Sequence, residues 1–228
     1  MTVAEPISSP IPAGNTRPAE GAVYPVVGLD VSALDPEFKA HAQRGIGRYV
    51  TELVRYFRGR QESGRPIMAP PSEAGDAGSG TLRVACFDHQ SIRTAGTGGT
   101  KVAAAIVERA PILRTTLRQQ CLYPFQLSHA EGILLSGQSA NPVELLRKSS
   151  VGRLPLQAVH FPAHMDAPAW GLSRYALTVL DLIPLVCADL YRAHQLGVRF
   201  RFARWLELSS IRNASVVLCI SQHTAHDV

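Results

Sequence analysis

VVGLDV at residues 26–31, followed by Arg-Gly-Ile-Gly-Arg-Tyr at residues 44–49, is the part of the sequence that decides the fold. The first run is almost continuously apolar, which is typical of a parallel strand covered on both faces. From residue 46 onward, apolar residues recur at the spacing of one face of a helix of about four turns. The members of that face are Ile46, Tyr49, Val50, Leu53, Val54 and Phe57. A buried strand followed by an amphipathic helix predicts the opening unit of an α/β fold.

The rest of the chain alternates short apolar runs with segments of helical spacing. We predict further strands at residues 81–88, 156–161, 175–182 and 214–220, and helices at residues 101–120 and 188–212. The last helix is expected to turn Val198, Phe202, Trp205 and Leu206 toward the core. This alternation is typical of a doubly wound, mostly parallel sheet, so we predict a Rossmann-like α/β domain. In such domains, ligands bind at the carboxyl ends of the strands.

Segments rich in proline and glycine mark the expected boundaries. Residues 1–23 have no periodic apolar pattern and predict a disordered tail. Residues 62–80 predict a flexible loop inside a single domain that spans residues 24–220. Ser221 is a typical helix N-cap. Because a helix of about two turns is marginal by itself, we expect residues 221–228 to begin an interdomain helix that is truncated here.

The composition limits the classes of protein to consider. With 46% hydrophobic and 18% charged residues, the 228-residue chain can bury a core and is unlike disordered or disulfide-scaffold proteins. Its net charge of +5 suits phosphorylated ligands or peripheral contact with an anionic membrane, and we expect no nucleic-acid partner. The four cysteines are far apart, which predicts buried thiols in a reducing compartment and no metal site.

The longest apolar stretch, residues 175–187, is interrupted by Asp181 and Pro184. It is shorter than the roughly 20 residues that a membrane-spanning helix needs. We therefore expect a cytoplasmic protein that is at most peripheral at the inner face of the membrane.

The first candidate site is the helix entry after the first strand. Gly45 and Gly47 let a ligand approach the backbone, and the free N–H groups of a helix N-terminus favour an anion. Arg44 and Arg48 flank these glycines and add positive charge. The same glycines would also permit a tight turn, and both interpretations stay open. A dinucleotide fingerprint would need a third glycine where this chain has Val50, so a nicotinamide or flavin cofactor is not predicted.

Two further candidates lie near the ends of predicted strands. His160, in Val-His-Phe-Pro, could contact a sugar hydroxyl or move a proton, or only hydrogen-bond a neighbouring loop. Asp181 lies inside an apolar run, where a carboxylate must either accept backbone hydrogen bonds or face a cleft. His164 follows His160, but without a third metal ligand at a suitable spacing. The arginines of residues 188–212 form either a solvated basic face or a surface for anionic lipid.

Taken in order, these motifs resemble the N-terminal half of family 4 glycosyltransferases, over residues 24–228. The motifs are RGIGRY at 44–49, VHFP at 159–162, TVLDLIPL at 178–185, YRAH at 191–194 and ISQHTAHD at 220–227. The resemblance implies two Rossmann-like domains with a cleft between them, of which this chain supplies the acceptor-side domain. The implied activity transfers a sugar, with retention of configuration, from a sugar nucleotide to a glycan or lipid-linked acceptor, without a metal or other cofactor.

The resemblance also assigns roles to the candidate residues. Gly45 and Gly47 would lie near the donor diphosphate, and Asp181 would be the catalytic residue that positions the reacting sugar. The family has a histidine directly before that aspartate, whereas this chain has Leu180. The residues predicted to bind donor phosphate or acceptor are Arg44, Gly45, Gly47, Arg48 and His160.

The donor-binding C-terminal domain of the family is missing from this chain. Because both walls of the cleft are needed to stabilise the transition state, we expect this chain alone to be inactive. The alternative function is a non-catalytic Rossmann-like module that binds a glycan, a lipid phosphate or a partner domain.

Overall fold

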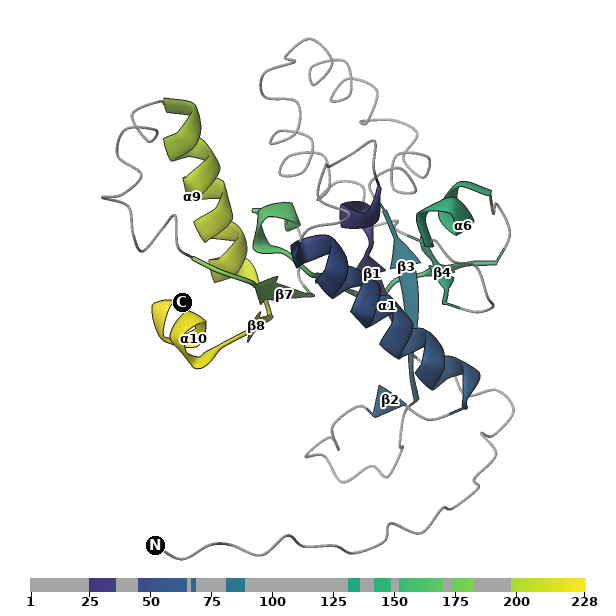
Figure 1. The fold of residues 1–228 in the computed structure, drawn as a ribbon. Helices are drawn as coiled ribbons and strands as arrows, with labels where there is room; N and C mark the ends of the chain where they lie inside the picture. The colour runs from purple at the N-terminus through teal and green to yellow at the C-terminus, as the bar shows by residue number, and fades with distance from the viewer. Residues whose placement is uncertain are drawn as a thin grey trace, which may run out of the picture.

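The computed structural model describes residues 25–35, 45–64, 67–68, 81–88, 131–135, 142–148, 152–169, 174–182 and 198–228. In these segments the chain forms an α/β fold, in which helices lie against a mixed, mostly parallel sheet (Figure 1). The predicted tail, the predicted helix at 101–120 and the first part of the predicted helix at 188–212 lie outside the described residues.

The described part of the chain contains eight short strands in one sheet. They are β1 (Val26–Asp30), β2 (Ile67–Met68), β3 (Thr81–Phe87), β4 (Glu131–Leu134), β5 (Arg153–Pro155), β6 (Ala158–Phe161), β7 (Tyr175–Val179) and β8 (Val216–Cys219). Their order is β5-β4-β3-β1-β6-β7-β8, and β2 pairs with β3. The strands β3, β1, β6, β7 and β8 are parallel to one another, whereas β2 and β4 run antiparallel to β3. The parallel strands therefore share one carboxyl edge.

The direction in which the chain adds strands reverses at β1. From β1 the chain passes to β3 on one side, and later to β6 on the other side, where Leu29 pairs with His160. In open α/β sheets, ligands bind in the crevice outside the carboxyl ends at such a reversal. A ligand site is therefore expected at the border between β1 and β6.

Helices cover both faces of the sheet. They are η1 (Ser32–Leu34), α1 (Gly45–Glu62), α6 (Pro142–Lys148), η3 (His164–Asp166), α9 (Val198–Asn213) and α10 (Gln222–Asp227). Cys86 and Phe87 are consecutive in β3 and belong to two different buried clusters, so the clusters lie on opposite faces. The Cys86 cluster includes Val50 and Val54 of α1. The Phe87 cluster includes Ile211 of α9.

The helix α1 runs opposite to the parallel strands that it covers. It contacts η1, which directly follows the carboxyl end of β1. Near its other end, Gln61 Nε2 donates a hydrogen bond to the carbonyl of Val84 in β3 (3.0 Å). The strand β2 then follows and pairs with the first residues of β3. The first turn of α1 therefore lies toward the carboxyl edge of the sheet.

The five predicted strands are confirmed as β1, β3, β6, β7 and β8, each slightly shorter than predicted. The predicted N-cap is also confirmed, because the Thr224 N–H donates to Ser221 Oγ (3.1 Å). The sequence pattern does not predict β2, β4, β5 or α6. The strand β2 lies inside the expected loop at 62–80, and β4 and β5 are too short to show an apolar period.

The face of α9 that meets the core differs from the predicted one. Leu206 is fully buried as predicted, but Phe202 and Trp205 are 37% and 53% exposed. Ser210 and Ile211, further along the helix, are buried instead. The predicted inward position of Phe202 and Trp205 is therefore wrong.

Hydrogen bonds to backbone carbonyls explain the rotation of α9. Tyr175 Oη donates to the carbonyl of Ser210, and Asn213 Nδ2 donates to the carbonyl of Ala169 (2.6 Å). These bonds fix the last turns of the helix against β7 and the loop after η3. The side chain of Val198, which was also predicted to face inward, lies outside the described part.

A strip of small residues crosses three neighbouring strands on the α9 face. Gly28 of β1 pairs with Ala85 of β3, and a Cβ built on Gly132 of β4 would lie 2.8 Å from the Ala85 Cβ. The side chain of Leu156 fills the strip, since a Cβ on Gly28 would lie 2.5 Å from its Cδ1 and one on Gly132 would lie 3.0 Å from its Cδ2. Leu156 thus packs where side chains on the two glycines would otherwise be.

Two of the four cysteines lie in described segments, and both are free thiols. Cys86 is buried in β3, where its Sγ donates to the carbonyl of Ile133 (3.4 Å). Desolvation raises the pKa of this thiol to about 12, as expected for a structural cysteine. Cys219 in β8 is only partly buried, which differs from the prediction.

Candidate functional site

The first turn of α1 contains the predicted glycines. Gly45 begins the helix and is exposed, whereas Gly47 is buried. The first four N–H groups of an α-helix have no acceptor inside the helix, so this turn presents backbone donors toward the carboxyl edge of the sheet. Arg48 is exposed on the same turn, and Arg44 lies outside the described residues.

Nothing in the local packing requires glycine at position 45. A Cβ built on Gly45 meets no atom of the described residues within 4 Å. In the described part of the chain, a positive φ occurs only at Gly64 and Gly152. The backbone at Gly45 is therefore open to space that a ligand could occupy, and a left-handed turn does not account for the residue.

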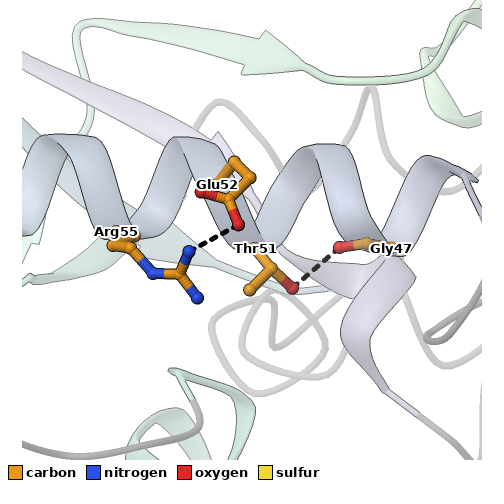
Figure 2. Close-up of polar contacts among 4 residues, drawn as sticks. All are labelled: Gly47, Thr51, Glu52 and Arg55. Atoms are coloured by element: carbon orange, nitrogen blue, oxygen red, sulfur yellow. Dashed lines mark hydrogen bonds and ion pairs between the residues drawn. The ribbon is translucent and has the colours of Figure 1, made fainter.

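The next turn of α1 is held by contacts along the helix. Figure 2 shows that Thr51 Oγ1 donates to the carbonyl of Gly47 (2.8 Å) and that Arg55 pairs with Glu52 (2.6 Å). The two charged side chains are mostly exposed, so this ion pair contributes at most about 0.5 kcal/mol. Arg48, one residue after Gly47, does not take part in this pair.

A chain of hydrogen bonds connects α1 to strands β6 and β7. His160 Nε2 lies 2.9 Å from Thr178 Oγ1, and Tyr49 Oη lies 3.3 Å from the same oxygen. Thr178 is buried, while His160 and Tyr49 are half-buried. Through Thr178, the structure brings His160 close to Tyr49, which directly follows the first turn of α1. Sequence reasoning missed the bridging role of Thr178, for which a hydroxyl inside an apolar strand is the available signal.

Burial determines the charge of His160. Desolvation lowers the pKa of its imidazole to about 4, from an ordinary value of 6.5. The ring is therefore neutral near pH 7, with one nitrogen as a donor and the other as an acceptor. A neutral imidazole can orient a hydroxyl group but adds no positive charge to the site.

This burial predicts a specific loss of stability in acid. The unfolded chain binds a proton at His160 near pH 6.5, whereas the folded chain binds it only near pH 4. The free energy of unfolding is therefore independent of this group above pH 6.5. It declines as the pH falls from 6.5 to about 4, by about 3 kcal/mol in total. We expect His160→Gln to reduce this decline in urea unfolding followed by circular dichroism between pH 7 and pH 4. His223→Gln, which changes an exposed histidine of α10, is the control, and an unaltered decline in His160→Gln would contradict the assignment.

Asp181 lies in a different environment from the predicted one. The strand β7 ends at Val179, and Asp181 follows two residues later with an exposed side chain. The expectation that it lies inside a buried strand is wrong, because the strand stops before it. Its position places the carboxylate at the carboxyl edge of the sheet, just beyond Thr178.

The buried strand carboxylate is Asp30, which sequence reasoning did not select. It ends β1 and is almost completely buried. Its Oδ1 accepts hydrogen bonds from the backbone N–H (2.9 Å) and the hydroxyl (2.6 Å) of Ser32. Asp30 also follows an apolar run, so the expectation stated for Asp181, that its carboxylate must accept backbone hydrogen bonds or face a cleft, applies equally to Asp30. Asp30 fixes the turn into η1, which in turn contacts α1.

Among the described residues, no group of three or more histidine, cysteine or acidic side chains could hold a metal ion. The described helices include none that is both long and apolar enough to span a bilayer.

Comparison with known proteins adds no relative. No protein-family model matches the chain, and no curated protein or solved structure is significantly similar to it.

Proposed function

We propose that this chain is the acceptor-side, Rossmann-like domain of a retaining glycosyltransferase that uses a sugar nucleotide. The proposal starts from the order of the RGIGRY, VHFP and TVLDLIPL motifs. Two structural features support it: a strand order that reverses at β1, and a helix entry at the carboxyl edge of the same strands. This is the arrangement in which open α/β sheets bind nucleotides and phosphates.

A single observation carries the proposal. The helix that begins with the open backbone at Gly45 contacts β6 and β7 one turn later, through the hydrogen bonds among Tyr49, Thr178 and His160. The described structure thus combines backbone N–H donors for an anion with a neutral imidazole suited to a hydroxyl group. A sugar nucleotide offers both a diphosphate and sugar hydroxyls.

In the proposed reaction, each group has a limited role. The N–H groups of the first turn of α1, including that of Gly47, would stabilise negative charge on the diphosphate as it leaves. Arg44 and Arg48 would add positive charge near it. His160 would hold a hydroxyl of donor or acceptor, and Asp181, exposed at the strand end, would position the transferred sugar.

The proposal includes a second lobe that closes the cleft, and β8 has a surface suited to it. Val216, Leu218 and Ile220 are 52%, 44% and 59% exposed. Leu218 pairs with Thr178, and paired residues point to the same face of a sheet. This apolar row therefore extends the α1 face, next to the hydrogen-bond chain. We propose that a donor-binding lobe covers it and that turnover requires that lobe.

The test is a nuclear magnetic resonance titration of the ¹⁵N-labelled chain with uridine, guanosine and adenosine diphosphate sugars at millimolar concentration. We expect the largest shifts at the amides of residues 45–48. In the variant Gly45→Val, a branched side chain would occupy the open space at the helix entry, and we expect binding to weaken about tenfold or more. Gly59→Val is the matched control, since Gly59 lies on the same helix and also has no atom near its Cβ position.

Three results would count against the proposal. One is the absence of shifts with all the sugar nucleotides when a donor-binding lobe is also added. Another is a set of shifts confined to residues far from the first turn of α1. The third is an equal loss of binding in Gly45→Val and Gly59→Val.

Leu180 favours the second candidate function, a non-catalytic binding module. In the glycosyltransferase family that this chain resembles, a histidine directly precedes the aspartate that corresponds to Asp181. With Leu180 in that place, one polar contact to the sugar would be missing. The two functions are distinguished by adding a donor-binding lobe and assaying sugar transfer with the original chain and with Leu180→His. Transfer by the original chain supports the enzyme, whereas binding without transfer in the original chain supports the module.

A further inference from the structure

The outer side of α9 carries an aromatic pair that the core does not use. Phe202 and Trp205 stack with their ring centroids 5.9 Å apart and their planes 24° from parallel. Both remain substantially exposed. Burying such rings stabilises a protein, so this exposed pair leaves an apolar surface that an external partner could cover.

This exposure follows from the way the helix is docked. Leu206, Ser210 and Ile211 face the protein, and Asn213 is tied to the loop after η3. The helix therefore cannot rotate its aromatic pair inward without breaking these contacts. The rings are held outward.

Two exposed arginines flank the rings. At 100° per residue, Arg201, Phe202, Trp205 and Arg212 fall within about a third of the helix circumference. All four side chains are exposed. The α9 sequence contains arginines at 199, 201, 204 and 212 and a single acid, Glu207. We call these four exposed residues the aromatic–arginine face.

We propose that the aromatic–arginine face docks on the surface of an anionic lipid bilayer. Aromatic rings partition into the headgroup boundary, and guanidinium groups bind lipid phosphates, often in a bidentate manner. Because the two kinds of side chain lie on one face, they can contact the interface together while Leu206 and Ile211 keep the other side of α9 packed on the protein. The proposal is independent of sugar transfer, because neither α1 nor the β6–β7 edge takes part in it.

A carbohydrate or a single-stranded nucleic acid could also stack on aromatic rings. The four-residue face has no carboxylate or amide to hydrogen-bond sugar hydroxyls, and the nearby Asn213 amide is already bonded. Nucleic-acid grooves combine several stacking positions along a basic channel, whereas here the rings form one compact pair on a helix surface. The charge and shape of the face therefore favour lipid.

Flotation with lipid vesicles tests the proposal, using phosphatidylcholine alone and phosphatidylcholine mixed with phosphatidylglycerol. We expect binding only to the mixed vesicles, and weaker binding at high salt. At about 1 kcal/mol for each basic residue, Arg201→Gln with Arg212→Gln should reduce the partition coefficient about 30-fold. Phe202→Ala with Trp205→Ala should also abolish most binding. Tyr56→Ala is the matched control, since Tyr56 is an equally exposed aromatic beside Arg60 on α1.

A second readout locates the helix. The chain has two tryptophans, so Trp170→Phe leaves Trp205 as the only indole. We expect its fluorescence to shift to the blue and to be quenched by lipids brominated near the headgroup. Circular dichroism of each variant identifies any loss of folding.

Three results would overturn the proposal. One is equal binding to neutral and anionic vesicles. Another is an equal loss of binding in Tyr56→Ala and in the α9 variants. The third is binding of a single-stranded oligonucleotide or an oligosaccharide in place of vesicles.

Discussion

Phe161→Ala is expected to lower the free energy of unfolding by about 3–5 kcal/mol, the usual range for removing a fully buried phenylalanine. Phe161 is completely buried at the end of β6. Its ring makes edge-to-face contacts with Phe87 (6.1 Å between centroids) and Tyr175 (5.9 Å). These rings come from three different strands, so the cavity would lie at the centre of the cluster on the α9 face. Urea unfolding followed by circular dichroism measures the change.

Phe202→Ala provides the control for this substitution. It removes the same side chain from a position that is 37% exposed, where we expect a loss below about 1 kcal/mol. Comparable losses in the two variants would mean that the cluster around Phe161 is not the tightly packed core that the structure shows.

Gly28→Val is expected to destabilise the fold by about 3 kcal/mol or more, through overpacking. The first added carbon would lie 2.5 Å from Leu156 Cδ1 and 2.8 Å from Phe87 Cδ1. Phe87 is fully buried against Phe161, so the ring has no free space into which to move. The same urea unfolding experiment measures the effect.

Leu156 offers a way to test that mechanism. Leu156→Ala alone should destabilise the protein, because Leu156 packs against the buried cluster. Combined with Gly28→Val, it should restore part of the lost stability, since the new methyl groups would enter the space that Leu156 leaves. Additive losses in the double variant would contradict a direct clash between the two residues.

The sequence predicted the elements with strong local patterns. The sequence predicts β1 and β7 from their continuous apolar runs, and it predicts α1 from apolar residues at helical spacing. The two patterns differ because a strand buried on both faces has no polar positions, whereas a helix buried on one face repeats its apolar positions every three or four residues. The short strands β4 and β5 carry no such period over their four and three residues. The strand β4 forms because β3 offers an edge to pair with, and β5 forms because β4 then offers the next edge, which is a property of the sheet and not of the local sequence.

The candidate site was predicted in part. Gly45, Gly47 and Arg48 follow from a helix entry after a strand, and the structure places them at the carboxyl edge of the sheet. The predicted environment of Asp181 was wrong, because the hydropathy of the sequence does not reveal that β7 ends at Val179. Thr178 was missed because its role depends on partners that are distant in the sequence.

The sequence by itself determined the α/β character, the main strands, the amphipathic α1 and the cap at Ser221, since each depends on interactions within a few residues. Only the tertiary structure decided the strand order, the rotation of α9 that leaves Trp205 exposed, and the neutral state of His160. Tyr49 and Thr178 are 129 residues apart in the chain and meet only when α1 packs on the sheet. Burial and long-range hydrogen bonds set these features, and both depend on how the elements pack and not on their local propensities.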